Sequence, residues 1–196
     1  MTKTARMLTA AATALLAGVA LTGCTINIGT GANDSDHDGM GMMGQNNNSG
    51  FSATDIMFAQ MMIPHHQQAV DMGTLAETRA LSPEVKALAA QIKAEQAPEI
   101  TQMQGWLTAA NAPMEMGHDM GMGGMLDDSE MEALKNSTGA EFDRLYLEGM
   151  IAHHQGAIKM AQMVIDSNNA EAKALGEAII SSQTEQIAYM QSLLAI

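Results

Sequence analysis

An internal repeat is the feature of this sequence that most constrains its fold. Residues 62–67, MIPHHQ, match residues 150–155, MIAHHQ, at every position except the third. Further along each copy, after a one-residue shift in register, apolar and amide residues recur at matching helical spacings. These residues are Leu88, Ile92, Gln96, Ile100, Met103 and Leu107 in the first copy, and Leu175, Ile179, Gln183, Ile187, Met190 and Leu194 in the second. The chain therefore contains two copies of one helical unit.

Capping signals divide the first copy into two helices. Ser52 is followed three residues later by Asp55, a pattern close to a capping box. The SPE segment at 82–84 reads as an N-cap, a first-turn proline and a first-turn acid. We therefore expect helices over about 52–79 and 82–110.

The second copy shows the same division. Thr138 and Glu141 form another capping-box pattern, which predicts that a third helix begins there. The asparagine pair at 168–169 indicates a turn between two helices. We therefore expect helices over about 138–167 and 170–194.

Two helical hairpins with short internal turns and one long connection favour an all-α fold. The expected architecture is a four-helix bundle with a crossover link. We place the bundle at residues 51–196, with repeats at 51–110 and 137–196. Between them lies a methionine-rich loop at 111–128, broken by proline and glycine, and a short helix around 129–135 is compatible with the sequence.

The N-terminal part of the chain does not resemble the bundle. Lys3 and Arg6 precede an apolar run of signal-peptide length, which ends in LTGC, similar to the lipobox of bacterial lipoproteins. We expect a signal peptide at 1–23, a lipid-modified Cys24 and a Gly-, Asn- and Met-rich tether at 24–50. The protein would then lie on the outer face of the cytoplasmic membrane. If Cys24 is not acylated, an ordinary periplasmic or secreted protein or an uncleaved anchor is expected.

Charge and cysteine content narrow the classes of partner. Cys24 is the only cysteine, so a lipid-modified chain keeps no thiol for a disulfide, for catalysis or for a metal. Removal of Lys3 and Arg6 from the nine basic residues leaves seven against 22 acidic ones, so the net charge is near −15. That charge disfavours nucleic acid and anionic lipid headgroups as partners and favours cations.

Each copy carries a stripe of histidine and methionine on one helix face. Spacings of three, four and three residues lie along one line of a helix. The stripes are Met62, His65, Ala69 and Met72 in the first copy, and Met150, His153, Ala157 and Met160 in the second. The adjacent His66 and His154 point about 100° away from their stripes. Each histidine pair is therefore expected to serve two sites, or to supply one ligand and one supporting or core residue.

The companion helix of each hairpin presents polar groups among apolar ones. The residues on this face are Gln96, Glu99 and Met103 in the first copy, and Gln183, Gln186 and Met190 in the second. Isoleucines beside them indicate that the face is at least partly buried. Buried polar groups need hydrogen-bond partners, and the histidine stripes could supply them.

Imidazole and thioether together suit soft or borderline metal ions. Thioethers bind Cu(I) well and Mg²⁺, Ca²⁺ or Zn²⁺ poorly, whereas imidazole binds both oxidation states of copper. Zinc prefers cysteine, further histidine or carboxylate, and neither histidine pair has the spacing of a zinc-protease motif. We therefore predict copper as the bound metal, with Cu(I) favoured and Cu(II) as a second option. The alternative is an inherited repeat whose histidines only pack and hydrogen-bond.

The link between the repeats offers further soft ligands. The segment MEMGHDMGMGGM contains Met114, Met116, His118, Met120, Met122 and Met125, and the tether contains HDGMGMMG. Thioethers in a glycine-rich chain can rearrange around a soft cation with little strain. We interpret the link as a weaker copper-capture segment. The alternative is a low-complexity linker in which the methionines are incidental.

The two motifs together resemble a known family. MxxHHxxAxxM on one helix, followed by QxxEIxxMxxW on the next, is similar to the domain-of-unknown-function-305 family, in two copies over about residues 51–194. The resemblance implies a ferritin-like helical bundle; some members are exported, bind copper and support copper resistance. It singles out Met62, His65, His66, Met72 and Met103, with Met150, His153, His154, Met160 and Met190. The second copy departs from the motif, with Gln186 in place of the acid and Leu193 in place of the tryptophan.

Three functions are compatible with these residues. The favoured one is a membrane-tethered copper-binding protein that sequesters copper, supports tolerance or passes copper to a transfer protein, without catalysis. The second is a metal-free structural or interaction lipoprotein whose histidines are satisfied by Gln96, Glu99, Gln183 and Gln186. A di-iron or redox enzyme is the weakest, because Glu148 lies five residues before His153 and the Glu-x-x-His motif of di-iron bundles is absent.

Overall fold

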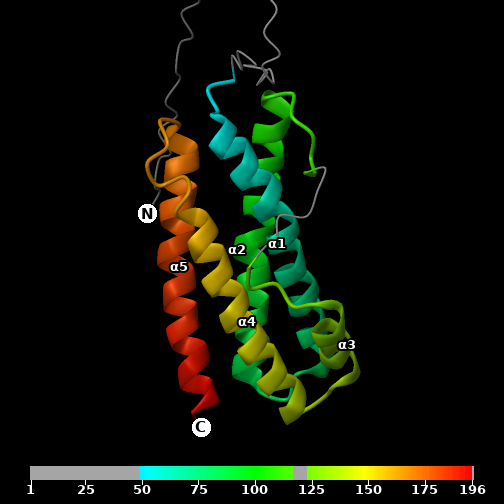
Figure 1. Cartoon of the computed structure of the whole chain (residues 1–196). Coiled ribbons are helices and arrows are strands. Elements are labelled where there is room, and N and C mark those ends of the chain that lie inside the picture. The colour runs from blue at the N-terminus through cyan, green and yellow to red at the C-terminus, as the bar shows by residue number, and fades with distance from the viewer. Residues whose placement is uncertain (1–48, 117–122, 196) are drawn as a thin grey trace, which may run out of the picture. The chain divides into compact units, whose positions relative to one another are not determined.

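The computed structural model describes residues 49–116 and 123–195 of the 196-residue chain. Five helices occur in these ranges: α1 (Ala53–Arg79), α2 (Pro83–Ala109), α3 (Asp128–Asn136), α4 (Ala140–Ala161) and α5 (Ala170–Leu194) (Figure 1). Within the same ranges, one isolated bridge between Ala80 and Gly139 is the only β-type pairing. None of the helices in the described part combines the length and the hydrophobicity needed to cross a membrane.

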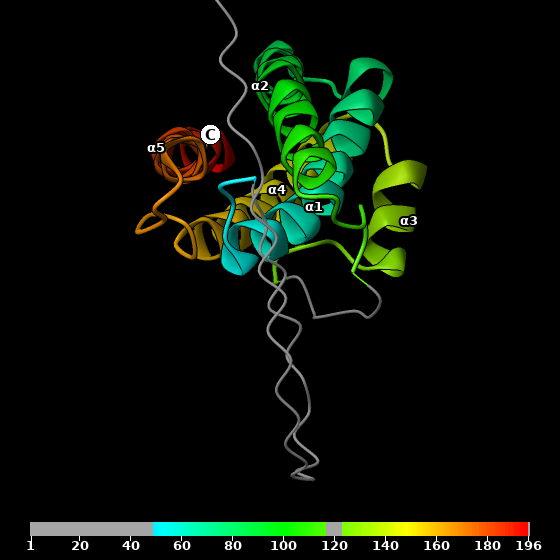
Figure 2. The same ribbon diagram turned by 90° about the horizontal axis from the view of Figure 1, so that it is seen from above.

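The helices pack as two antiparallel hairpins joined along α1 and α4. α1 packs along α2, α4 packs along α5, and the two hairpins meet where α1 packs on α4. Viewed from above, α2 and α5 lie on the outside of this central pair (Figure 2). The prediction of an all-α bundle built from two hairpins with a long link is therefore confirmed.

Local side-chain capping sets the start of α1, α2 and α5, and a capping box at Asp127 starts α3. The side chain of Ser52 accepts a hydrogen bond from the backbone N–H of Asp55, whose carboxylate accepts one from the Ser52 N–H at 2.7 Å. Ser82 caps α2, with Pro83 in its first turn, and Asn169 caps α5. The predicted capping box is therefore present, and the predicted bounds of α1, α2 and α5 agree with the structure to within one residue.

The capping box predicted at the start of α4 is absent. Gly139, and not Thr138, is the N-cap, and it supplies no side-chain capping bond. Its φ of +69° lies in the left-handed region that favours glycine. This conformation lets the Gly139 N–H donate to the carbonyl of Arg79, while Asp143 accepts two backbone N–H groups at the start of α2. Contacts between the hairpins therefore replace the predicted capping box.

The predicted end of α4 near Ser167 is wrong. The helix ends at Ala161, and the N–H groups of Met163 and Val164 bond to carbonyls three residues back. This tighter winding turns the chain towards α5. Val164 is fully buried, and its side chain fills the space where a Cβ on Gly176 would lie. Packing of the turn on α5 therefore ends the helix earlier than the sequence pattern indicates.

The core consists of two apolar clusters with a polar layer between them. One cluster contains the C-terminal half of α1 and the first half of α4, and the other contains the N-terminal half of α1 and the end of α4. Buried polar side chains occupy the levels between the clusters. We call this set the polar layer: His65, His66, Gln96, His153, His154, Gln183 and Gln186.

Candidate metal site

The centre of the polar layer is a pair of stacked histidines from α1 and α4. The ring centroids of His65 and His153 are 3.7 Å apart, with 37° between the ring planes. The Nε2 atom of His153 donates to the backbone carbonyl of His65 at 2.9 Å. Both side chains are fully buried. The stripe histidines of the two repeats, 88 residues apart in sequence, are therefore in direct contact.

The second histidine of each pair points to the outer helix of its own hairpin. The ring centroids within the pairs are 6.4 Å and 6.2 Å apart, as expected for neighbouring residues on different helix faces. His66 Nε2 lies 2.8 Å from a carboxylate oxygen of Glu99, and His154 Nε2 lies 2.7 Å from the amide oxygen of Gln186. The amide nitrogen of Gln186 then donates to Glu95 at 2.7 Å. The predicted divergence of the adjacent imidazoles is confirmed.

These partners determine which ring nitrogen is free. A carbonyl, a carboxylate or an amide oxygen can only accept, so Nε2 of His66, His153 and His154 carries the proton. In a singly protonated ring the Nδ1 atom then presents a lone pair. All three Nδ1 atoms are buried and have no hydrogen-bond partner among residues 49–116 and 123–195, and neither nitrogen of His65 has one there. This arrangement is typical of metal-ligating imidazoles, in which the other nitrogen is held by an acceptor.

Burial keeps His65, His153 and His154 neutral. It lowers the pKa of His65 to about 3, with a further reduction from the neighbouring His66. It lowers the pKa of His154 to about 4, although the hydrogen bond with Gln186 partly offsets the effect. The pKa of His153 is also well below its ordinary value, first because of burial and then because of His65. Neutral imidazole is the form that binds metal ions, so these rings need not lose a proton to act as ligands at neutral pH.

Methionines border the polar layer on both sides. In one apolar cluster Met62, Met103 and Met160 are buried together, and in the other Met72, Met150 and Met190. We call these sets the methionine triads. Each triad takes two methionines from one repeat and one from the other, because α1 and α4 run in opposite directions (Figure 1). The ten core ligands predicted from sequence are thus brought together as four histidines with a triad on either side.

Gln96 and Gln183 do not act as the metal-free alternative requires. Both side chains are only 2% exposed, yet both amide atoms of Gln96 and the amide oxygen of Gln183 lack partners in the described part of the chain. Only Glu99 and Gln186 bond to histidine. In that part no three His, Cys, Asp or Glu side chains are grouped around one metal-sized position. A metal site with three or more ligands in that part would therefore need thioethers or amides.

The link between the repeats returns to the bundle at two glycines. A Cβ on Gly156 of α4 would collide with the Gly123 carbonyl, and one on Gly124, where φ is +88°, would collide with the Ala152 carbonyl. Backbones that approach this closely leave no room for a side chain. The Gly123 backbone also lies near the His65 ring, without a hydrogen bond of normal geometry. Sequence reasoning missed this contact. In a glycine-rich link, the residue type alone does not show which glycine packs against a helix and which lies in an open loop.

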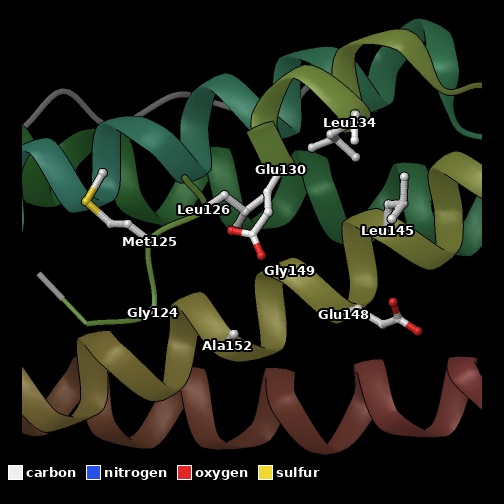
Figure 3. A pocket seen from close by; sticks show the side chains of 10 residues that line it. Gly124, Met125, Leu126, Glu130, Leu134, Leu145, Glu148, Gly149 and Ala152 are labelled. Carbon is white, nitrogen blue, oxygen red and sulfur yellow. The ribbon is translucent and has the colours of Figure 1, made fainter. Parts of the chain in front are cut away.

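Three of the six predicted loop ligands, Met114, Met116 and Met125, lie in the described residues. Met114 is exposed and Met116 is half-buried, while His118, Met120, Met122 and the lipidation candidate Cys24 lie outside the described residues. Met125 lines a pocket of about 290 Å³ between the end of the link, α3 and α4 (Figure 3). The ten residues that line this pocket include no histidine, and the Glu130 carboxylate points across it towards Gly149.

Sequence and structure comparisons place the bundle among known folds. Residues 55–194 match the model of the family described as Domain of unknown function (DUF305). A DUF305 protein from Streptomyces coelicolor is 34% identical, with 72% of this chain and 92% of that chain covered and a TM-score of 0.69. A DUF305 fragment from Deinococcus radiodurans is 28% identical, with 74% and 97% covered and a TM-score of 0.68. None of the curated proteins matches the chain.

Structures of CopM with bound metal are also similar. The Cu(II)-bound form is 35% identical, with 71% of this chain and 94% of the CopM chain covered and a TM-score of 0.62. The Cu(I)-bound form is 33% identical, with 72% and 96% covered and a TM-score of 0.61, and Ag-bound forms match as well. The family match spans both histidine pairs and both methionine triads. This chain belongs to the DUF305 family.

Proposed function

We propose that this protein binds copper outside the cytoplasm, for sequestration, tolerance or transfer, and is tethered to the membrane through a lipid on Cys24. The likeness to CopM, which binds Cu(I) and Cu(II), supports copper as the metal. The signal-peptide pattern and the LTGC segment support export and anchoring. The proposal assigns no catalytic step to the protein.

One observation carries the proposal: imidazole nitrogens without partners are buried at the centre of the bundle. The free atoms are Nδ1 of His66, His153 and His154 and both nitrogens of His65, as judged within the described ranges. Buried polar atoms in native proteins nearly always have a partner, so this many exceptions in one layer point to a missing ligand. A metal ion satisfies such lone pairs directly.

The methionine triads favour Cu(I) at the central pair. His65 and His153 stack at the crossing of α1 and α4, and Met62 and Met150 lie one helical turn from them. Thioether and neutral imidazole are soft and uncharged, so they can hold Cu(I) in an apolar core without a buried negative charge. In our proposal these residues, with the rest of the two triads, supply the Cu(I) ligands.

The methionines of the link act as weaker capture ligands in this proposal. Its C-terminal end is packed on α4 at Gly156, next to the ring of His65. Copper held by the link would therefore be close to the core ligands. The set consists of Met114, Met116, His118, Met120, Met122 and Met125.

Cu(I) titration against a competing chelator tests the proposal. The purified protein is compared with a His65→Leu/His153→Leu variant, which fills the space of the rings and removes their lone pairs. Gln67→Leu/Gln155→Leu is the matched control, because it places the same side chain at the exposed residues two positions along α1 and α4. We expect the core variant to lose the tightest Cu(I) site with its helical circular dichroism intact, and the control to bind as the unchanged protein does.

Two other results would overturn parts of the proposal. Unchanged tight binding by the core variant would place the copper on the methionines of the link instead. Absence of Cu(I) binding by the unchanged protein would reject the copper function altogether. The polar layer would then be a structural device, as in the metal-free alternative.

A further inference from the structure

The open side of the bundle lies between α2 and α5. Side-chain hydrogen bonds join the two helices there: Gln186 donates to Glu95, and the Trp106 indole donates to Glu171 at 3.2 Å. Two pockets, of about 240 and 650 Å³, are lined by residues of both helices or their ends, and Glu95 lines both. We call this region the α2/α5 seam. It gives solvent a route to the outer edge of the polar layer.

Four buried side chains beneath the seam carry unpartnered polar atoms. They are His66 and His154, each with a free Nδ1 in the described structure, and Gln96 and Gln183, each with a free amide oxygen there. All four are at least 98% buried. His66 is close enough to His154 to add to the lowering of its pKa, after burial as the main cause. None of the four belongs to a methionine triad or to the central stacked pair.

The internal repeat relates these four residues in pairs. Gln96 occupies the position in α2 that Gln183 occupies in α5, and His66 corresponds to His154. The two histidines already reach the outer helices, through Glu99 on α2 and Gln186 on α5. The Gln186–Glu95 hydrogen bond brings α5 and α2 together at the level of Gln96, which is adjacent to Glu95 in sequence. Gln96 lies one helical turn from Glu99, the partner of His66, and Gln183 lies one helical turn from Gln186, the partner of His154.

We infer that the α2/α5 seam holds a second metal site, specific for Cu(II), whose ligands are Nδ1 of His66 and His154 and the amide oxygens of Gln96 and Gln183. This inference rests on the proposed copper function and divides the histidine pairs between two sites of different chemistry. Two nitrogens and two oxygens form the donor set that Cu(II) favours in tetragonal geometry. The central pair and the triads keep the softer set for Cu(I).

The charges around the seam fit a divalent cation. None of the four ligand atoms carries a negative charge, so the ion's charge must be balanced from outside the ligand set. Glu99 accepts from Nε2 of His66, and Glu95 accepts from Gln186, which in turn holds His154. Glu99 thus stands directly behind one imidazole, and Glu95 stands behind the other through Gln186. A carboxylate in such a position orients a histidine ligand and raises its basicity. No such carboxylate bonds to the central pair in the described residues.

Separate titrations with Cu(II) and with Cu(I) test the inference on the purified protein. The diagnostic variant is Gln96→Leu/Gln183→Leu, which removes both amides and leaves every histidine and methionine in place. Gln67→Leu/Gln155→Leu is again the matched control, with the same change at exposed positions. We expect the diagnostic variant to lose at least about tenfold in Cu(II) affinity and to change by less than about twofold in Cu(I) affinity. The control variant should keep its Cu(II) affinity. The electron paramagnetic resonance spectrum of bound Cu(II) should show coupling to two nitrogens.

Each outcome discriminates between the two proposals. If the unchanged protein binds Cu(I) but not Cu(II), or if the diagnostic variant keeps its full Cu(II) affinity, the seam site is rejected and the Cu(I) function stands. If neither ion binds, both fail. Retained Cu(I) binding and helical circular dichroism show that the diagnostic variant is folded. We expect it to be at least as stable as the unchanged protein without metal, because it replaces buried, unpartnered amides by apolar groups.

Discussion

His153 donates its Nε2 proton to the backbone carbonyl of His65, so the two repeats are joined at their equivalent histidines. The bond is 2.9 Å long and lies where α1 and α4 pack together. It holds His153 in the Nε2-protonated form and leaves its Nδ1 with a free lone pair. Four further predictions follow from this polar layer and its surroundings, and one from the N-terminal segment.

Stability without metal should fall when the pH drops below 6.5. In the folded protein the pKa of His65 is lowered to about 3 and that of His154 to about 4, whereas both are near 6.5 in the unfolded chain. Below pH 6.5 the unfolded chain therefore takes up protons that the folded protein excludes. Each of these histidines should then reduce the free energy of unfolding by about 1.4 kcal/mol per pH unit.

Urea unfolding between pH 7.5 and 5 measures this effect, in a range above the titration of ordinary carboxylates. Above pH 6.5 the histidines are neutral in both states and contribute no pH dependence. In a His65→Leu variant, the unfolding free energy should depend less steeply on pH. The difference in slope should correspond to about one fewer proton taken up on unfolding. Parallel curves for the variant and the unchanged protein would contradict the assignment of His65 as a buried neutral ring.

Removal of the Gln186 amide should be costly only while His154 is present. Gln186→Leu leaves the Nε2–H of His154 buried without an acceptor, which should cost about 1–3 kcal/mol of stability. The double variant Gln186→Leu/His154→Leu removes both partners and should recover much of that loss. Chemical unfolding of the four proteins in this cycle gives the coupling energy. Additive effects of the two substitutions would mean that the hydrogen bond contributes nothing.

Gly156→Ala should displace the end of the link from α4. The added Cβ collides with the Gly123 carbonyl, a backbone atom that cannot rotate away, so we expect a loss of about 1–3 kcal/mol. Faster proteolysis of the link should accompany it. Gly105→Ala is the control, because Gly105 lies in α2 with open space around its Cβ position. The Gly105→Ala variant should gain up to about 1 kcal/mol of unfolding free energy from helix propensity. An equal loss of stability in both variants would disprove the contact between Gly156 and Gly123.

Replacement of triad methionines should affect Cu(I) more than stability. Met62→Leu/Met150→Leu conserves core volume, so it should cost less than about 1.5 kcal/mol of unfolding free energy for each site. The loss of two thioethers should weaken Cu(I) binding by at least about tenfold. Met131→Leu/Met163→Leu is the matched control, at half-buried methionines outside the triads. Equal Cu(I) affinities in both variants would remove the triads from the ligand set.

Cys24→Ser should release the protein from the membrane. If Cys24 carries the lipid, the unchanged protein incorporates labelled fatty acid and sediments with membranes, whereas the variant does neither. Expression in a bacterium with a lipoprotein-processing pathway provides the measurement. Equal membrane association of both proteins would indicate an uncleaved signal anchor instead.

The sequence by itself determined the bounds of α1, α2 and α5, the repeat and most of the candidate ligand residues. Capping residues such as Ser52 and Asn169 act through bonds to their own neighbours, so the bounds of α1, α2 and α5 could be read locally. The three-and-four spacing of His65 with Met62 and Met72 likewise reports a shared helix face directly. The divergence of His66 from His65 followed from the same helical geometry.

Only the tertiary structure decided how these pieces combine. The start of α4 at Gly139 depends on a bond to Arg79, and the packing of Gly156 depends on the carbonyl of Gly123. The sorting of six methionines into two mixed triads depends on the opposite directions of α1 and α4. Which imidazole nitrogen is free depends on acceptors 32, 33 and 88 residues away in the sequence. Helix periodicity is a local property of the backbone, whereas contacts between helices are set by the packing of the whole core.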